Sequence, residues 1–179
     1  MFVAGTPRIF NNNPICMKYL FTVLLLSPLF VWAQDCKLKK GIDDMTSRPT
    51  LSTGFISFDD FNLSMDAGSK EIDFFFVVKV GSKCFDENSV VTAIFEGRNQ
   101  KAEYKNTGSM NCDGTVHVIF RNLSFTLSSL TKLATKKTVS LAFTDTNGKV
   151  NTVTLSPAQQ QLLMDNAACI AKEAKTLVQ

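Results

Sequence analysis

Apolar and polar residues alternate most strongly between Glu71 and Val80, with the two-residue period of a β-strand. One set of alternate positions is apolar throughout, whereas the other is charged at both ends and apolar only at Phe75 and Val77. Successive side chains of a strand point to opposite faces of its sheet. The pattern therefore predicts a central strand with one fully buried face and a second face that is covered only at its middle.

Shorter alternating segments around this stretch predict an antiparallel sheet of about seven or eight strands. Residues 66–69 have turn composition and should close one hairpin, and Asn147-Gly148 suits the type I′ turn of another. Residues 34–50 lack core periodicity, and we expect a loop or a short helix there. The other predicted strands are residues 53–58, 61–65, 90–96, 101–105, 115–121, 137–145 and 150–155.

Two segments have helical periodicity. Leucines recur at every third position of residues 127–134, which predicts a short helix at a sheet edge. Residues 156–177 carry a stronger signal, because Ser156 and Gln159 form a capping-box pattern around Pro157 and an apolar stripe follows. We expect this stripe to pack on the second face of the central strand rather than to bind a membrane or a partner, because tertiary packing supplies most helix stability. Together the elements predict an α+β fold, in which a sandwich or a strongly curled sheet carries a C-terminal packing helix.

The N-terminus has the order of features found in a signal peptide. Lys18 precedes an apolar run at residues 20–26, the helix breaker Pro28 follows, and Ala33 ends a Val-Trp-Ala sequence that suits cleavage. The run is too short for a transmembrane helix, which needs about 20 apolar residues, and no later run is long enough. We therefore expect residues 17–33 to be a signal peptide and the protein to be periplasmic or secreted.

Residues 1–16 have no periodicity and precede a natural start at Met17. We interpret them as an extension that results from a start codon placed too early. The junction Ala33-Gln34 resembles the cleavage sites of exported proteins of Bacteroidota. This resemblance covers the signal alone and implies export. We expect residues 34–179 to form one disulfide-stapled globular domain.

Size and charge limit the class of partner. Removing 33 of the 179 residues leaves 146, which is enough for one domain with a proper core. Of the 19 basic residues, Arg8 and Lys18 lie in the removed part, so 17 remain against 16 acidic residues. A nearly neutral domain is a poor match for nucleic acid or an anionic membrane. We expect an unknown protein or a small apolar ligand as the partner, and no cofactor.

The cysteines that follow the signal indicate disulfides, because their number is even and the chain is sent to an oxidising compartment. They are Cys36, Cys84, Cys112 and Cys169. Cys84 follows the central strand and Cys112 precedes the strand at 115–121, so antiparallel pairing would place both at one end of the sheet. We therefore expect a Cys84–Cys112 disulfide and, from the remaining pair, a Cys36–Cys169 disulfide. No Cys-x-x-Cys spacing supports a redox or metal site.

His117 is the only histidine, so any catalytic triad or imidazole metal site would need it. Thr115 and Arg121 share its strand face, which is typical of a solvated surface rather than of a general base. No Gly-x-Ser-x-Gly elbow supports a triad. The acid pairs at 43–44 and 59–60 suit solvated turns, because adjacent carboxylates diverge and seldom share an ion. The sequence therefore assigns no catalytic, cofactor-binding or metal-binding residue.

Export, two disulfides and the lack of a catalytic constellation favour a non-enzymatic interaction or binding module. A second hypothesis is a carrier of an apolar small molecule in a β cavity, suggested by the high phenylalanine content. The Gly-x-Trp sequence of lipocalin-type carriers is missing, because the only Trp lies in the signal. A third hypothesis is a small hydrolase that uses His117.

Overall fold

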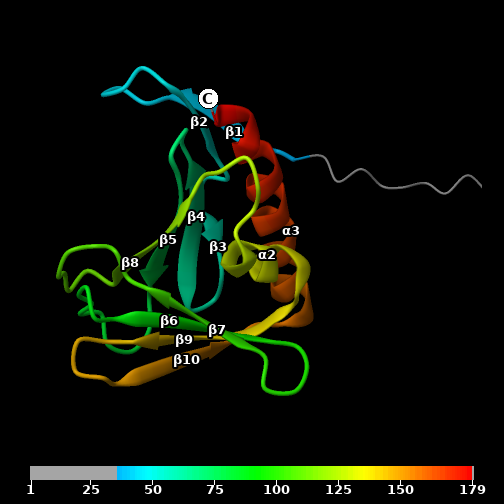
Figure 1. Cartoon of the computed structure of the whole chain (residues 1–179). Coiled ribbons are helices and arrows are strands. Elements are labelled where there is room, and N and C mark those ends of the chain that lie inside the picture. The colour runs from blue at the N-terminus through cyan, green and yellow to red at the C-terminus, as the bar shows by residue number, and fades with distance from the viewer. Residues whose placement is uncertain (1–35, 179) are drawn as a thin grey trace, which may run out of the picture. The chain divides into compact units, whose positions relative to one another are not determined.

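The structure, a computed structural model, describes residues 36–178, so the predicted extension at 1–16 and signal peptide at 17–33 lie outside the described residues. The described chain forms two antiparallel sheets with helices beside them (Figure 1). The first sheet has six strands in the order β1-β2-β4-β5-β8, with β3 paired to β4, and the second has four in the order β10-β9-β6-β7. The predicted α+β class is confirmed, with more strands than expected.

Most elements lie where the sequence pattern places them. The strands are β1 (Lys39–Ile42), β2 (Pro49–Ser52), β3 (Ile56–Ser57), β4 (Phe61–Ala67), β5 (Glu71–Val78), β6 (Val90–Phe95), β7 (Lys101–Lys105), β8 (Thr115–Arg121), β9 (Thr138–Thr144) and β10 (Val150–Thr154). The helices are α2 (Ser128–Thr135) and α3 (Pro157–Glu173), which the 3-10 turn η1 (Ala174–Leu177) extends. Neither α-helix of the described chain is long and apolar enough to cross a membrane.

The hydrophobic core lies against one face of the first sheet, which we call the inner face. The second sheet packs on part of it: the Phe143 ring of β9 lies 5.9 Å from the Phe61 ring of β4 and 5.6 Å from the Phe76 ring of β5. α3 packs on another part and fully buries Leu163 and Ile170. Figure 1 shows this arrangement, with α3 along the first sheet and the second sheet below it.

The face that α3 covers differs from our expectation. α3 contacts β2, β4 and β9, on the side of the buried residues Phe74 and Phe76, whereas Phe75 and Val77 point to the opposite face of β5. The physical reason is area: the inner face is apolar across several strands, so the helix removes more apolar surface from water there than two side chains would offer.

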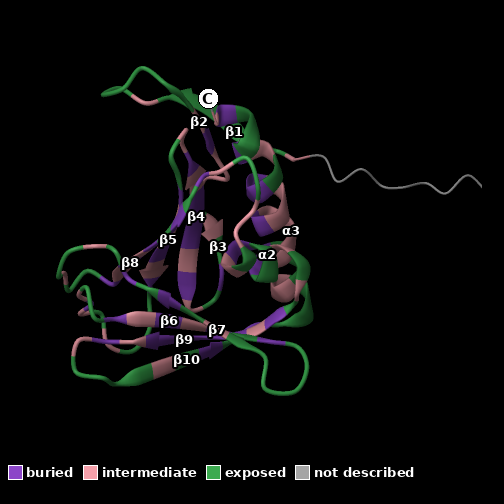
Figure 2. Cartoon of the chain, viewed as in Figure 1, coloured by how far each residue is buried: buried purple, intermediate pink, exposed green. Residues whose placement is uncertain are grey.

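The prediction of a loop or short helix for residues 34–50 is wrong, because β1 and β2 form a hairpin. All four residues of β1 are exposed, and Leu51 is the single buried residue of β2. Figure 2 shows the exposure of this hairpin in green. A strand at a sheet edge with little buried surface has no alternating apolar pattern, so the periodicity of the sequence does not reveal it.

The strand expected at 53–58 is also shorter than predicted, since only Ile56 and Ser57 pair with β4. Gly54 has a φ of +65° just before them, a conformation that interrupts a strand and that glycine adopts at little cost. Phe55 consequently leaves the plane of the sheet. At the other end of the core, β5 stops at Val78, and Val80 beyond it is partly exposed.

Disulfides join elements that are distant in sequence. Cys84 and Cys112 are bonded with their Cα atoms 3.8 Å apart, next to the isolated bridge between Phe85 and Asn111. Cys36 and Cys169 are bonded with a Cα separation of 5.5 Å and tie the chain before β1 to α3. This is the pairing that the strand ends predict. Two disulfides fit a β-rich domain that matures in an oxidising compartment.

Candidate functional site

The face of the first sheet opposite the core, which we call the outer face, gathers the polar and aromatic side chains of its strands. Cross-strand pairing sets these side chains in rows, because residues directly opposite one another in neighbouring strands point to the same side. The outward positions of the three long strands are Asn62, Ser64 and Asp66 of β4, Asp73, Phe75 and Val77 of β5, and Thr115, His117 and Ile119 of β8.

One row of the outer face is aromatic, and we call Phe55, Phe75 and His117 the aromatic row. Phe75 lies directly opposite His117, and their rings stack with centroids 4.6 Å apart. Phe55 belongs to the segment before β3, and its ring centroid lies 6.0 Å from that of Phe75. Phe55 is 62% exposed, so the row ends in an apolar side chain that the described residues leave largely uncovered.

The next row along the strands is acidic, and we call Asp66 and Asp73 the acid row. The two carboxylates belong to directly opposed residues of β4 and β5. Asp66 accepts a hydrogen bond from the Ser64 hydroxyl at 2.7 Å. The second oxygen of Asp73, Oδ1, is buried without a hydrogen-bond partner among the described residues. Like charges in this arrangement repel each other when both carboxyls are ionised.

Asp73 and His117 are coupled across the two rows. Nδ1 of His117 lies 2.7 Å from Oδ2 of Asp73, so an N–H at Nδ1 donates to the carboxylate. The Asp73 side chain is 24% exposed and that of His117 36%. Burial raises the pKa of the Asp73 carboxyl, His117 opposes this shift, and the charges of Asp66 and Glu71 add to it. The pair is therefore a half-buried dyad with a carboxyl that ionises less readily than usual.

His117 is held in place from the loop before β8. Its backbone N–H donates to Oδ1 of Asn106 at 2.9 Å, and its carbonyl accepts from the N–H of Thr107 at 2.9 Å. Gly108 packs against the ring so closely that a Cβ there would lie 3.1 Å from Cδ2 of His117. These contacts fix both the backbone and the ring of the histidine.

The dyad orients an imidazole but has no serine or cysteine in the adjoining strand positions. An Asp–His hydrogen bond through Nδ1 leaves Nε2 to act as a base in hydrolases. The outward positions that flank His117 on β8 are Thr115 and Ile119, and Phe75 lies directly opposite it on β5, between Asp73 and Val77. General-base chemistry at this point would thus act on a water molecule or on the Thr115 hydroxyl.

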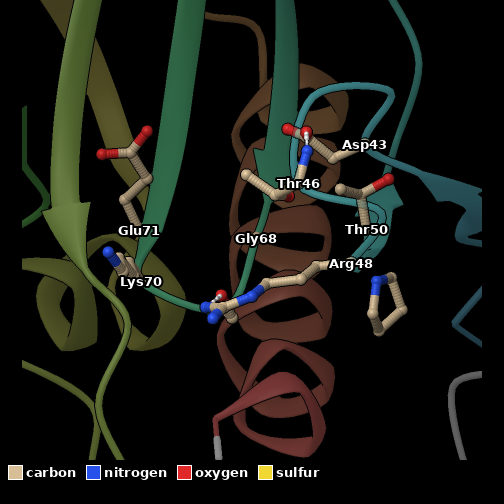
Figure 3. A pocket seen from close by; sticks show the side chains of 9 residues that line it. Asp43, Thr46, Arg48, Thr50, Gly68, Lys70 and Glu71 are labelled. Carbon is tan, nitrogen blue, oxygen red and sulfur yellow. Dashed lines mark hydrogen bonds between the residues drawn. The ribbon is translucent and has the colours of Figure 1, made fainter.

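Beyond the acid row lies a solvent-open pocket of about 370 Å³, which we call the turn pocket. Thr50 and Glu71 line it and occupy outward positions, so the turn pocket continues the outer face. Figure 3 shows its side chains in front of the strands, with α3 behind. Nη1 of Arg48 donates to Oγ of Ser69 at 3.0 Å, and Lys70 lies on the same turn. The remaining lining residues are Asp43, Thr46, Pro49 and Gly68.

The acid pairs named from the sequence belong to turns. The Asp43 carboxylate accepts from the N–H groups of Thr46 at 2.7 Å and Met45 at 2.9 Å, and these bonds lower its pKa. Asp59 accepts from the side chain of Gln159 at 3.1 Å, next to the start of α3. Within residues 36–178, no group of three or more His, Cys, Asp or Glu side chains is arranged to hold a metal ion.

Sequence reasoning identified His117 but not its partners. Asp73 was visible only as a charge at the end of a strand, and Phe55 as one phenylalanine among many. The phenylalanines of the core are explained by packing, since Phe61, Phe76 and Phe143 contact one another between the two sheets. The turn pocket is lined by no phenylalanine, so the aromatic content gives no support to an apolar carrier there.

Comparison of the chain with protein-family models, with curated proteins and with solved structures found no match. The function of the protein must therefore be inferred from the geometry of the outer face.

Proposed function

We propose that this protein is an exported, non-enzymatic interaction domain that binds a partner polypeptide through its outer face. The observation that carries the proposal is the exposure of Phe55, which lies against Phe75 instead of in the core. Exposed aromatic side chains are enriched at the centres of protein interfaces, because their burial contributes a large apolar area with little loss of rotamer freedom. The outer face also combines this apolar centre with charged groups around it.

Two features support export to the periplasm or to the outside of the cell, and a third favours a protein partner. The pattern of residues 17–33 is that of a signal peptide, and its cleavage junction resembles those of exported proteins of Bacteroidota. The two disulfides fit an oxidising compartment. The near balance of charge after the signal argues for a protein partner over nucleic acid.

A photo-crosslinking experiment tests the interaction proposal. The photoreactive residue p-benzoylphenylalanine replaces Phe55 in one sample and Leu162, an exposed residue of α3, in a matched control. After irradiation of intact cells that export the protein, we expect a discrete crosslinked polypeptide with the probe at Phe55 and none at Leu162. Equal crosslinking at both positions, or none at either, would contradict the proposal.

The Asp73–His117 hydrogen bond favours one second candidate function, a hydrolase in which His117 activates water. A panel of fluorogenic esters, phosphodiesters and peptides tests it with the wild type, His117→Ala and Asp73→Asn. A hydrolase of this kind would lose roughly 100-fold or more of its turnover in His117→Ala. Activity that survives this substitution would exclude the dyad as its source.

A further inference from the structure

The outer face and the turn pocket present three kinds of chemistry in a fixed order along the strands. Phe75 belongs to the aromatic row, Asp73 two residues earlier to the acid row, and Glu71 two residues earlier again to the wall of the turn pocket. Residues two apart in a strand are about 6.8 Å apart along it. The rows therefore follow one another with the same spacing as alternate side chains of an extended polypeptide.

Asp73 of the acid row is paired with His117, whereas Asp66 carries a charge that no nearby cation of the described chain compensates. No ion pair formed within residues 36–178 involves Asp66. Arg121 lies directly opposite Glu71 across β5 and β8, and the ammonium of Lys39 lies over Gly54. A positive side chain placed over the acid row would neutralise Asp66 and lie beside the aromatic row, where cation–π attraction adds to the ion pair.

The turn pocket, in contrast, offers positive groups. Two of its lining residues are basic, Arg48 and Lys70, and the Arg48 guanidinium is bonded to the neutral hydroxyl of Ser69. The pocket also holds two acids: the Asp43 carboxylate accepts backbone N–H groups of its own turn, and Glu71 lies opposite Arg121 in the strand register. Neither Arg48 nor Lys70 forms an ion pair within residues 36–178, so both cations are open to a carboxylate of a ligand.

We propose that the outer face takes an extended segment of the partner whose alternate side chains are apolar, basic and acidic, over the aromatic row, the acid row and the turn pocket respectively. This inference rests on the proposed function, since it specifies what the interaction domain binds. The apolar side chain packs on Phe55 and Phe75, the basic one pairs with Asp66, and the acidic one pairs with Arg48 and Lys70.

Capped pentapeptides test the order of the three side chains. The matched probe is acetyl-Leu-Ser-Arg-Ser-Glu-amide, and its neutral analogues carry citrulline for arginine or glutamine for glutamate. A permuted probe, acetyl-Arg-Ser-Leu-Ser-Glu-amide, keeps the composition but breaks the order in both chain directions. Dissociation constants come from chemical-shift titration of the exported, disulfide-bonded protein.

We expect each neutral analogue to bind the wild type about two- to fivefold more weakly than the matched probe, as solvent-exposed ion pairs allow. Asp66→Asn should abolish the preference for arginine over citrulline and keep that for glutamate, whereas Lys70→Gln should weaken only the latter. Asp165→Asn, on α3 behind the sheet, is the control and should keep both preferences.

The inference is overturned if the permuted probe binds as well as the matched one, if the arginine preference survives in Asp66→Asn, or if no probe binds at millimolar concentration. Lys70→Gln is an independent check, because Lys70 lies in a turn at the surface and its substitution leaves the core intact. A polypeptide that crosslinks at Phe55 but lacks the alternating pattern would leave the interaction domain standing and reject only this assignment.

Discussion

At the scale of single residues, Asp73 is the group whose environment is most unusual for its type. Its carboxyl is partly buried, bonds to His117 through one oxygen and leaves the other oxygen without a partner among the described residues. Burial is the main reason that its pKa is raised, and the opposed Asp66 contributes to the shift. The protonated form of such a carboxyl is favoured more strongly in the folded chain than in the unfolded chain.

This shift predicts how the stability depends on pH. The native pKa of Asp73 lies above the unfolded value of 3.8. The protonated carboxyl therefore stabilises the folded chain fully below pH 3.8, and this stabilisation is lost as the pH rises through the native pKa. The free energy of unfolding of the wild type, relative to Asp73→Asn, should therefore fall as the pH rises from below 3.8 through the raised native pKa. Urea titrations across this range measure it.

Asp145 supplies the control of opposite sign. Hydrogen bonds from Ser82 and from the N–H groups of Lys149 and Asn147 hold the pKa of this carboxyl below its usual value. Its contribution is present above the unfolded pKa and lost as the pH falls through the native one. The wild type should thus gain stability relative to Asp145→Asn as the pH rises. Parallel slopes for Asp73→Asn and Asp145→Asn would contradict our assignment.

At the scale of elements, the start of α3 carries the most complete local signal. The N–H of Gln159 donates to the Ser156 hydroxyl at 3.4 Å, and the N–H of Ser156 donates to Oε1 of Gln159 at 2.9 Å. Pro157 occupies the first turn. These bonds satisfy backbone groups that a helix N-terminus otherwise leaves free.

Ser156→Ala should lower the free energy of unfolding by about 1 kcal/mol, because it removes the acceptor at the N-cap. Ser128→Ala is the matched control at the start of α2, whose N-cap Leu127 makes no side-chain cap bond. It should change stability by no more than about 0.5 kcal/mol. Guanidinium unfolding of both variants gives the comparison, and equal losses would show that the α3 cap contributes nothing specific.

At the scale of the whole molecule, phenylalanine has two distinct roles. Phe143 is 1% exposed and joins the two sheets through its contacts with Phe61 and Phe76. Phe55 is 62% exposed and lies on the outer face. The core thus depends on the first residue, whereas the proposed interface depends on the second.

Truncation separates these roles. Phe143→Ala should cost about 3–5 kcal/mol of unfolding free energy, since it leaves a cavity between the sheets. Phe55→Ala should cost about 1 kcal/mol or less, because most of its surface already meets solvent. Thermal and urea unfolding measure both. A large loss of stability in Phe55→Ala would assign that ring to the fold and remove the argument for an interface.

Much of the fold can be predicted from the sequence because its signals are local. The alternation of β4, β5, β8 and β9, the turn at Asn147-Gly148 and the cap of α3 each depend on residues a few positions apart. The disulfide pairing followed from the same strands, since antiparallel neighbours bring Cys84 and Cys112 to one end of the sheet. The β1–β2 hairpin could not be predicted, because an exposed edge strand needs no apolar period.

Periodicity by itself determined which residues of β5 are buried, but tertiary structure decided what covers each face of the strand. α3 packs on the broader apolar face, and Phe55 reaches the other through the turn at Gly54. The contact between Asp73 and His117 joins positions 44 residues apart through the register of β5 and β8. Register is a property of two strands together, so neither segment carries it alone, and the site exists only once the sheet has formed.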